Sequence, residues 1–226
     1  TTEPVRIIKT TNTGATWAAS NVTNSGVTLP KDADVAIPAQ GYSGIPANDF
    51  TRGQSFYDLV ITVDPTNDAI FYVGGIDIFR TSNSGSTWTQ VSKWSNNSGL
   101  NSLSVSTVHA DQHAIVFNPK NTSQIAFGND GGIYFCSNKA NIATTTGISV
   151  RNNRYNVTQF YDAKLNPSNT VNSEEILAGA QDNGTRRFTG APLANNLYSD
   201  AYYDGGDGAF VEFDDNNLYK ISSYVY

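Results

Sequence analysis

Residues 107–137 read TVHADQHAIVFNPKNTSQIAFGNDGGIYFCS, and they contain one complete unit of a pattern that recurs on both sides. The run HAIVF ends at 118–121, Asn-Pro-Lys-Asn, whose residues favour a turn by fixing φ or by hydrogen-bonding their own backbone. A second run, QIAFG, ends at 129–132, Asn-Asp-Gly-Gly, where glycine supplies the backbone freedom of a tight turn before IYFCS. The segment therefore predicts an antiparallel meander of short strands.

Turns of the same two kinds return at a spacing of roughly fifty residues, which is typical of propeller blades and other repeat arrays. Copies of the first turn are Val63-Asp64-Pro65, Phe117-Asn118-Pro119, Leu165-Asn166-Pro167 and Phe213-Asp214-Asp215. Copies of the second turn are Gly74-Gly75-Ile76-Asp77, Asn129-Asp130-Gly131-Gly132 and Gln181-Asp182-Asn183-Gly184. These repeats indicate at least four modules of one design.

Composition agrees with an all-β protein and excludes two classes of partner. Asn, Gly, Ser and Thr separate the apolar runs, and no run has helical spacing. The net charge of −6 comes without the clustered Lys and Arg of nucleic-acid binders. No apolar stretch approaches the ~20 residues of a membrane helix. We expect neither nucleic-acid binding nor membrane insertion.

Two near-identical octets, TTNTGATW at 10–17 and TSNSGSTW at 81–88, each predict a tight turn. In such a turn Asn caps the backbone, Gly takes a positive φ, and Trp packs back onto the sheet. We favour this structural role over ligand binding for Asn12, Gly14, Trp17, Asn83, Gly85 and Trp88. Cys136, the single cysteine, replaces Thr81 when 137–141 is aligned as a decayed third copy, which predicts a buried, inert thiol.

The repeat predicts a β-propeller of four-stranded antiparallel blades, with all of 1–226 belonging to one domain. The approximate blades are 1–30 (partial), 54–94, 109–150, 158–200 and 205–226 (partial). The Pro- and Gly-rich segment 30–53 is predicted to be an insertion loop, and 89–108 a polar connection between blades. About four blades leave the ring incomplete, so we expect the chain to be part of a longer protein.

Because turns of a meander alternate between its two ends, the blade entries and the glycine turns should meet at one mouth of the central channel. The candidate binding residues there are His109, Asp111, His113, Asn129, Gln181, Asn183 and Asp207, with Asp58, Asp77 and Asp204 at the same end. Asp130 and Asp182 hold equivalent places in neighbouring blades, and glycoside hydrolysis requires two carboxyl groups. We favour the other interpretation, in which each Asp caps its own glycine turn.

The HADQH segment at 109–113 carries both histidines of the chain. Alternate residues of a strand share a face, which raises the possibility of a metal site. On an extended strand, however, the two histidine Cα atoms lie roughly 13 Å apart, near the limit for two imidazoles on one ion. We therefore favour a structural hydrogen-bond network over catalysis or substrate binding, and expect no metal and no cofactor.

The octets resemble the Asp-box, the S/T-x-D-x-G-x-T-W turn of sialidase-like, sortilin-like and related propellers, with Asn12 and Asn83 at the Asp position. Together with HADQH, NDGG at 129–132, QDNGT at 181–185 and GGDG at 205–208, they make nearly all of the chain similar to secreted BNR/Asp-box propellers. The resemblance is to the sortilin-like and xyloglucanase-like group, of the Bacteroidetes surface-protein type.

This resemblance implies a secreted or cell-surface module that binds a glycan or a surface protein at the Asp/His-rich mouth, beside the remaining blades of the same propeller. The alternative is a xyloglucanase-like or sialidase-like glycoside hydrolase using Asp130 and Asp182. A sialidase also needs three arginines around a carboxylate, and the sequence has one adjacent pair, Arg186-Arg187. A third hypothesis is a scaffold or export passenger with no ligand of its own.

Overall fold

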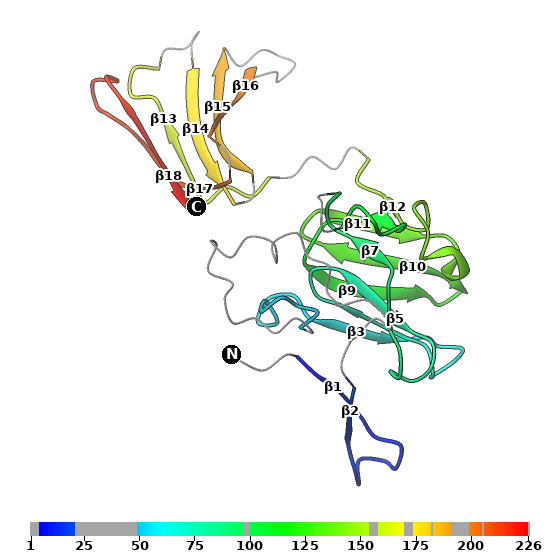
Figure 1. Ribbon diagram of the computed structural model, residues 1–226. Helices are drawn as coiled ribbons and strands as arrows, with labels where there is room; N and C mark the ends of the chain where they lie inside the picture. Colours follow the sequence, from blue (N-terminus) through cyan, green and yellow to red (C-terminus); the bar gives the residue numbers. More distant parts are fainter. Residues whose placement is uncertain are drawn as a thin grey trace. The chain divides into compact units, whose positions relative to one another are not determined.

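The protein is described here by a computed structural model, drawn in Figure 1. The chain divides into two compact units, 1–153 and 154–226. The described residues are 5–20, 49–96, 100–153, 158–169, 174–181, 183–190, 199–204 and 206–225.

Two four-stranded antiparallel sheets make up most of the first unit (Figure 1). The first sheet contains β3 (Val60–Val63), β4 (Phe71–Gly74), β5 (Ile78–Thr81) and β6 (Thr89–Gln90). The second contains β9 (Gln112–Asn118), β10 (Asn121–Asn129), β11 (Gly132–Cys136) and β12 (Ser149–Val150). Each strand pairs with the next one in the chain, so the meander predicted around HAIVF is confirmed.

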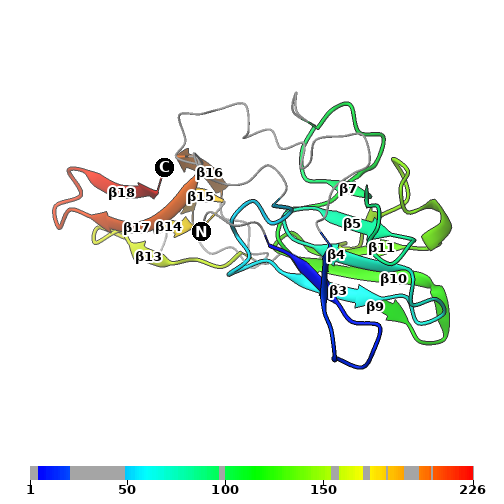
Figure 2. The same cartoon turned by 60° about the horizontal axis from the view of Figure 1, so that its bottom comes forward.

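The two sheets pack through their first strands, β3 and β9, which lie side by side (Figure 2). The hydroxyl of Thr62 donates to the carbonyl oxygen of Ile115 at 2.7 Å, which ties one sheet to the other. Cys136 is fully buried in the core, and burial raises the pKa of its thiol, as a buried, inert cysteine requires. The core residues are Tyr72, Ile78, Val91, Val108, Ile115, Ile125, Phe127, Cys136, Ile142 and Ile148.

The two octets form the same turn. Asn83 accepts a hydrogen bond from the amide of Thr87 at 2.8 Å and donates to its hydroxyl at 2.9 Å. Asn12 and Thr16 make the same two bonds at 2.9 and 2.8 Å. The glycine in each octet has a positive φ, 93° in the first and 87° in the second, which favours residues without a Cβ. Near-identical sequences thus give near-identical turns.

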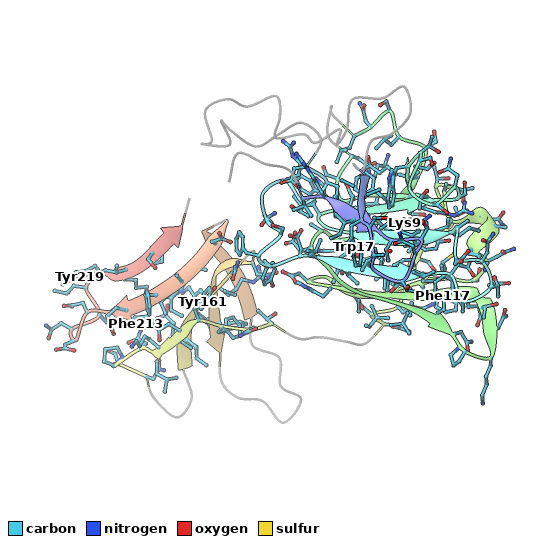
Figure 3. The ribbon with its side chains drawn as sticks, turned by 90° about the horizontal axis from the view of Figure 1, so that it is seen from below. Lys9, Trp17, Phe117, Tyr161, Phe213 and Tyr219 are labelled. Carbon is cyan, nitrogen blue, oxygen red and sulfur yellow. The ribbon has the colours of Figure 1, made fainter. Side chains whose placement is uncertain are left out.

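The two octet tryptophans differ in their surroundings. Trp88 is 1% exposed and meets Phe71 edge-on, with ring centroids 5.1 Å apart. Trp17 is 59% exposed and follows the turn between β1 (Ile7–Lys9) and β2 (Ala18–Ser20) (Figure 3). Trp88 therefore anchors its turn to a core, whereas the described part of the chain gives Trp17 only a two-stranded sheet and leaves it exposed.

The segment 89–108 connects the outer strand β6 to the inner strand β9 as predicted, but it is more than a polar loop. It contains a short parallel pair, β7 (Ser92–Lys93) with β8 (Ser106–Thr107). Leu100 is fully buried, and the buried ammonium group of Lys93 donates to the carbonyl oxygen of Leu103 at 2.8 Å. The many turn-forming residues of this segment indicate a surface loop. The segment is nevertheless buried, because its polar groups find hydrogen-bond partners in residues distant in the sequence.

The second unit holds one four-stranded antiparallel sheet and a hairpin (Figure 1). The sheet contains β13 (Asp162–Leu165), β14 (Glu174–Ala180), β15 (Gly184–Gly190) and β16 (Ser199–Asp204). The hairpin is formed by β17 (Asp207–Phe213) and β18 (Lys220–Val225). The amide of Val211 donates to Asp162 at 3.3 Å, and Leu177, Val211 and Phe213 form the buried cluster between sheet and hairpin.

The predicted fold class is confirmed: the protein is all-β and built of four-stranded antiparallel meanders, the blades of a β-propeller. The three complete sheets span 60–90, 112–150 and 162–204. Most of the predicted insertion loop, 30–48, lies outside the described residues. Within the described ranges, no helix is long and apolar enough to cross a membrane.

A cluster of charges around Glu175 joins the elements of the second unit. Its carboxylate, 12% exposed, accepts from Arg187 at 2.5 Å, from Lys220 at 2.7 Å and from the Asn166 amide at 2.6 Å. Burial alone would raise the pKa of Glu175, but the bonds from Lys220, Asn166 and Arg187 outweigh it and lower that pKa to about 2. The cluster connects β14, β15, β18 and the turn after β13.

We expect Asn83→Ala to lower the free energy of unfolding by about 1–2 kcal/mol, because it removes the bonds that hold the turn beside Trp88. Asn12→Ala removes the same bonds from the turn beside the exposed Trp17, and it should cost less than about 1 kcal/mol. Urea unfolding of both variants makes the comparison. Equal losses would show that burial of the tryptophan does not set the importance of the turn.

Glu175→Gln should lower the free energy of unfolding by about 1–3 kcal/mol at pH 7, because two cations lose their counter-charge. With a folded pKa of about 2 against an ordinary 4.5, this stabilisation is complete above pH 4.5 and is lost as pH falls toward 2. The deficit of the variant should shrink over that window in urea unfolding at several pH values. The exposed carboxylate variant Asp215→Asn is the control, and a similar window there would contradict the assignment.

Candidate functional site

The HADQH segment and the two glycine turns of the first unit lie at the same end of their sheets. The amide of Gln112 donates to the carbonyl oxygen of Gly75 in the β4–β5 turn at 2.8 Å. Gln112 is also the register partner of Asn129, which begins the β10–β11 turn. The predicted alternation of turns therefore holds here, and it brings together residues from three separate stretches of sequence.

His113 and Asp130 from these stretches join Tyr57, which precedes β3, in the Tyr57–His113–Asp130 cluster. His113 Nε2 lies 2.7 Å from Asp130 Oδ1, and the Tyr57 hydroxyl donates to Asp130 Oδ2 at 2.9 Å. The Tyr57 and His113 rings meet edge-on with centroids 4.9 Å apart. Their accessibility remains substantial, since the side chains of His113 and Asp130 are 37% and 22% exposed. The cluster is thus held in place and reachable from solvent.

Asp130 does not cap its own glycine turn. The amide of Gly131 donates instead to the side-chain oxygen of Asn129 at 3.0 Å. The capping interpretation of Asp130 is therefore wrong, because the preceding residue already supplies the acceptor. This leaves the Asp130 carboxylate directed toward His113 and Tyr57, while Asn129, predicted to bind a ligand, shapes the turn.

The side chain of Gln112 is fully buried and bonds to residues that neighbour the cluster in sequence. Its amide nitrogen donates to the carbonyl oxygens of His109 at 2.6 Å and Ile76 at 3.3 Å. Its amide oxygen accepts from Asn129 at 3.3 Å. The sequence analysis did not identify Gln112. Its position between His109 and His113 was the one feature of the sequence that pointed to it.

Asp58 and Asp111 form a carboxyl pair near the Tyr57–His113–Asp130 cluster. Asp58 is fully buried, and its carboxyl group lies within hydrogen-bond reach of that of Asp111. Burial, and then the charge of Asp111, raise the pKa of Asp58 to about 8. Burial, and then the charge of Asp130, also raise the pKa of Asp111. With a pKa of about 8, Asp58 is protonated at neutral pH.

Two other candidates of the first unit, His109 and Asp77, make contacts that hold the fold together. His109 is exposed, but its ring packs so closely on Gly131 that a Cβ at that glycine would overlap it. Asp77 is buried, and its carboxylate accepts from Gln90 at 3.0 Å and Ser92 at 3.1 Å. The parts of the chain that the structure describes contain no group of three His, Cys, Asp or Glu residues arranged around a metal ion.

The remaining candidates belong to the second unit. The side chain of Gln181 accepts from the Tyr161 hydroxyl at 2.5 Å. The main-chain carbonyl oxygen of Gln181 accepts from the side-chain amide of Asn183 at 3.1 Å. Asp207 begins β17 and is half-buried. Asp182, the predicted catalytic partner of Asp130, lies outside the described residues. The proposed catalytic pair is therefore not assembled among the residues that can be described.

Sequence analysis missed Tyr57, although a signal for it was present. The tripeptide Phe-Tyr-Asp occurs at 56–58 and again at 160–162, each time at the entry to a blade. Both tyrosine hydroxyls donate to a residue of a glycine turn, Tyr57 to Asp130 and Tyr161 to Gln181. A repeated tripeptide in phase with the blades indicates a shared contact, and it could have identified both tyrosines.

No protein family matches the chain, and no curated protein matches it either. Among solved structures it is similar to YCF48 from Cyanidioschyzon merolae, with 12% identity and a TM-score of 0.39 over 92% of this chain. It is also similar to an ancestral GH74 enzyme, with 13% identity and a TM-score of 0.41 over 93% of this chain. The chain spans 57% of the first protein and 26% of the second. With TM-scores of this size, the fold class rests on the sheets themselves.

Proposed function

We propose that the first unit is a propeller-type binding module that recognises a glycan at the Tyr57–His113–Asp130 cluster. The observation that supports this is a carboxylate, an imidazole and a phenol that hold one another at 2.7–2.9 Å on an accessible end of the sheets. Because neighbouring residues supply the structural bonds of the turn, the carboxylate of Asp130 is available to a ligand. Such pre-organisation lowers the entropy cost of binding.

Hydroxyl-rich ligands suit this chemistry. The Asp130 carboxylate accepts hydrogen bonds from sugar hydroxyls, and the Tyr57 and His113 rings offer both apolar edges and polar atoms. Phe56 and Leu59, on either side of the Tyr57–Asp58 step, are 88% and 52% exposed and provide apolar surface for sugar C–H groups. The net charge of −6 and the carboxylates disfavour anionic polymers, so the proposed ligand is a neutral glycan.

We further propose that the protein is secreted or displayed at a cell surface, among BNR/Asp-box propellers of the Bacteroidetes type. The support for this is the sequence resemblance of the two octets, together with their shared turn geometry. Its partner there would be a glycan, free or carried by a surface protein. The setting and the ligand are separate proposals, and either one can fail alone.

Glycoside hydrolysis is the second candidate function, and the protonated Asp58 is the feature that favours it. A glycosidase needs a carboxylic acid that keeps its proton near neutral pH, as Asp58 does. Asp58 is fully buried against Asp111, however, and cannot reach a glycosidic oxygen in this conformation. Burial therefore makes binding the better-supported function.

Asp130→Asn should weaken glycan binding about 10–100-fold, because it removes the charged acceptor at the centre of the cluster. Tyr57→Phe should weaken binding about 3–10-fold through loss of one hydroxyl. Binding is measured by titration calorimetry with neutral oligosaccharides chosen from a glycan array, and Asp68→Asn serves as an exposed control. Equal affinity of all variants would exclude this cluster as the site. Release of reducing sugar would instead favour hydrolysis.

Asp58→Asn should stabilise the protein at pH 8, by roughly 2–4 kcal/mol, and have little effect at pH 4. The folded pKa of about 8 exceeds the ordinary 3.8, so the wild-type protein loses stability as pH rises between these values, whereas Asn carries no such penalty. Urea unfolding in EDTA across pH 4–8 tests this. A variant that is less stable than wild type at pH 8 would contradict the assigned protonation.

A further inference from the structure

The Asp58–Asp111 pair is not explained by glycan binding. Both oxygens of Asp58 and Oδ1 of Asp111 are buried, and none has a hydrogen-bond donor partner among the described residues. Buried carboxylate oxygens without donors are costly, and a like charge within hydrogen-bond reach adds to that cost. A fold that keeps such a pair needs something positive between the two groups.

A proton fills this requirement only in part. One shared proton bonds one oxygen of Asp58 to one oxygen of Asp111, which leaves the second Asp58 oxygen buried without a partner. A metal cation coordinates several oxygens at once and can engage all three unpartnered atoms. The number of unpartnered oxygens therefore favours a cation over a proton as the group that the pair is built to hold.

We propose that the Asp58–Asp111 pair of the first unit is a calcium site. Carboxylate oxygens are hard donors, and calcium accepts six to eight oxygens in flexible geometry, whereas magnesium demands a near-ideal octahedron and keeps more of its water. Two carboxylates would be completed by water and main-chain oxygens. With so few charged ligands, the expected affinity is in the weak range of extracellular modules, about 10⁻⁴–10⁻³ M.

The surroundings of the pair suit cation entry. Asp111 is half-buried, which opens the pair to solvent on one side, while Asp58 forms the closed side. Asp49 lies near Asp58, and Asp130 lies near Asp111, and both add negative potential at the pair. His109 and His113 also lie near Asp111, and they oppose this potential when protonated. A bound calcium would tie the Tyr57–Asp58 entry step to the HADQH segment.

The test is calcium titration of the whole 226-residue chain after treatment with EDTA, followed by thermal unfolding and by calorimetry. Calcium at ten times its dissociation constant should raise Tm by about 4 °C. Asp58→Asn and Asp111→Asn should each abolish this shift, and Asp68→Asn should retain it. Asp58→Asn is expected to fold, since a neutral amide replaces a carboxyl group whose ionisation is disfavoured by burial.

Three results would overturn the proposal. The first is the absence of any calcium-dependent shift in the wild-type protein. The second is a calcium shift of full size in both pair variants, which would place the ion elsewhere. The third is an equal shift with sodium chloride at matched ionic strength, which would indicate charge screening rather than a site. A smaller shift with magnesium than with calcium is the expected selectivity.

Discussion

The arrangement of the HADQH segment and the two glycine turns of the first unit depends on one buried residue, Gln112. Its backbone amide holds the β4–β5 turn, and its side chain bonds the carbonyl oxygen of His109 and the side chain of Asn129. A buried amide can satisfy its donors and acceptor only if these partners stay in place, so the three stretches must move together. The position of the accessible Tyr57–His113–Asp130 cluster is therefore fixed by Gln112, a residue outside the cluster.

A division of labour between adjacent polar residues follows from this constraint. Asn129 caps the glycine turn and meets Gln112, so the next residue, Asp130, keeps its carboxylate for His113 and Tyr57. In the second unit Gln181 accepts from a tyrosine hydroxyl in the corresponding turn. Turn chemistry therefore sets where the backbone bends. The turn residue that accepts from the tyrosine differs between the units, since it is Asp130 in the first and Gln181, at the position equivalent to Asn129, in the second.

Local sequence predicts this fold well where the chemistry is local. Turn residues define the meander of β9, β10 and β11, and the octets define two turns with the same bonds. Contacts that join distant residues were missed, because a local pattern does not identify the distant partner. Tyr57 reaches Asp130 across more than seventy residues of chain, and Lys93 is buried in a segment whose composition indicates a loop. The repeated Phe-Tyr-Asp was the only sequence trace of the first contact.

Two acidic clusters show how the same burial can serve stability or function. Glu175 has two cations and an amide around its carboxylate, and its lowered pKa means that the charge stabilises the fold. Asp58 has another carboxyl group in that place, and its raised pKa means that ionising this group opposes folding. A cluster that stabilises its fold needs no further purpose. A pair that destabilises its fold is retained at a free-energy cost, and this is typical of sites that bind an ion or a ligand.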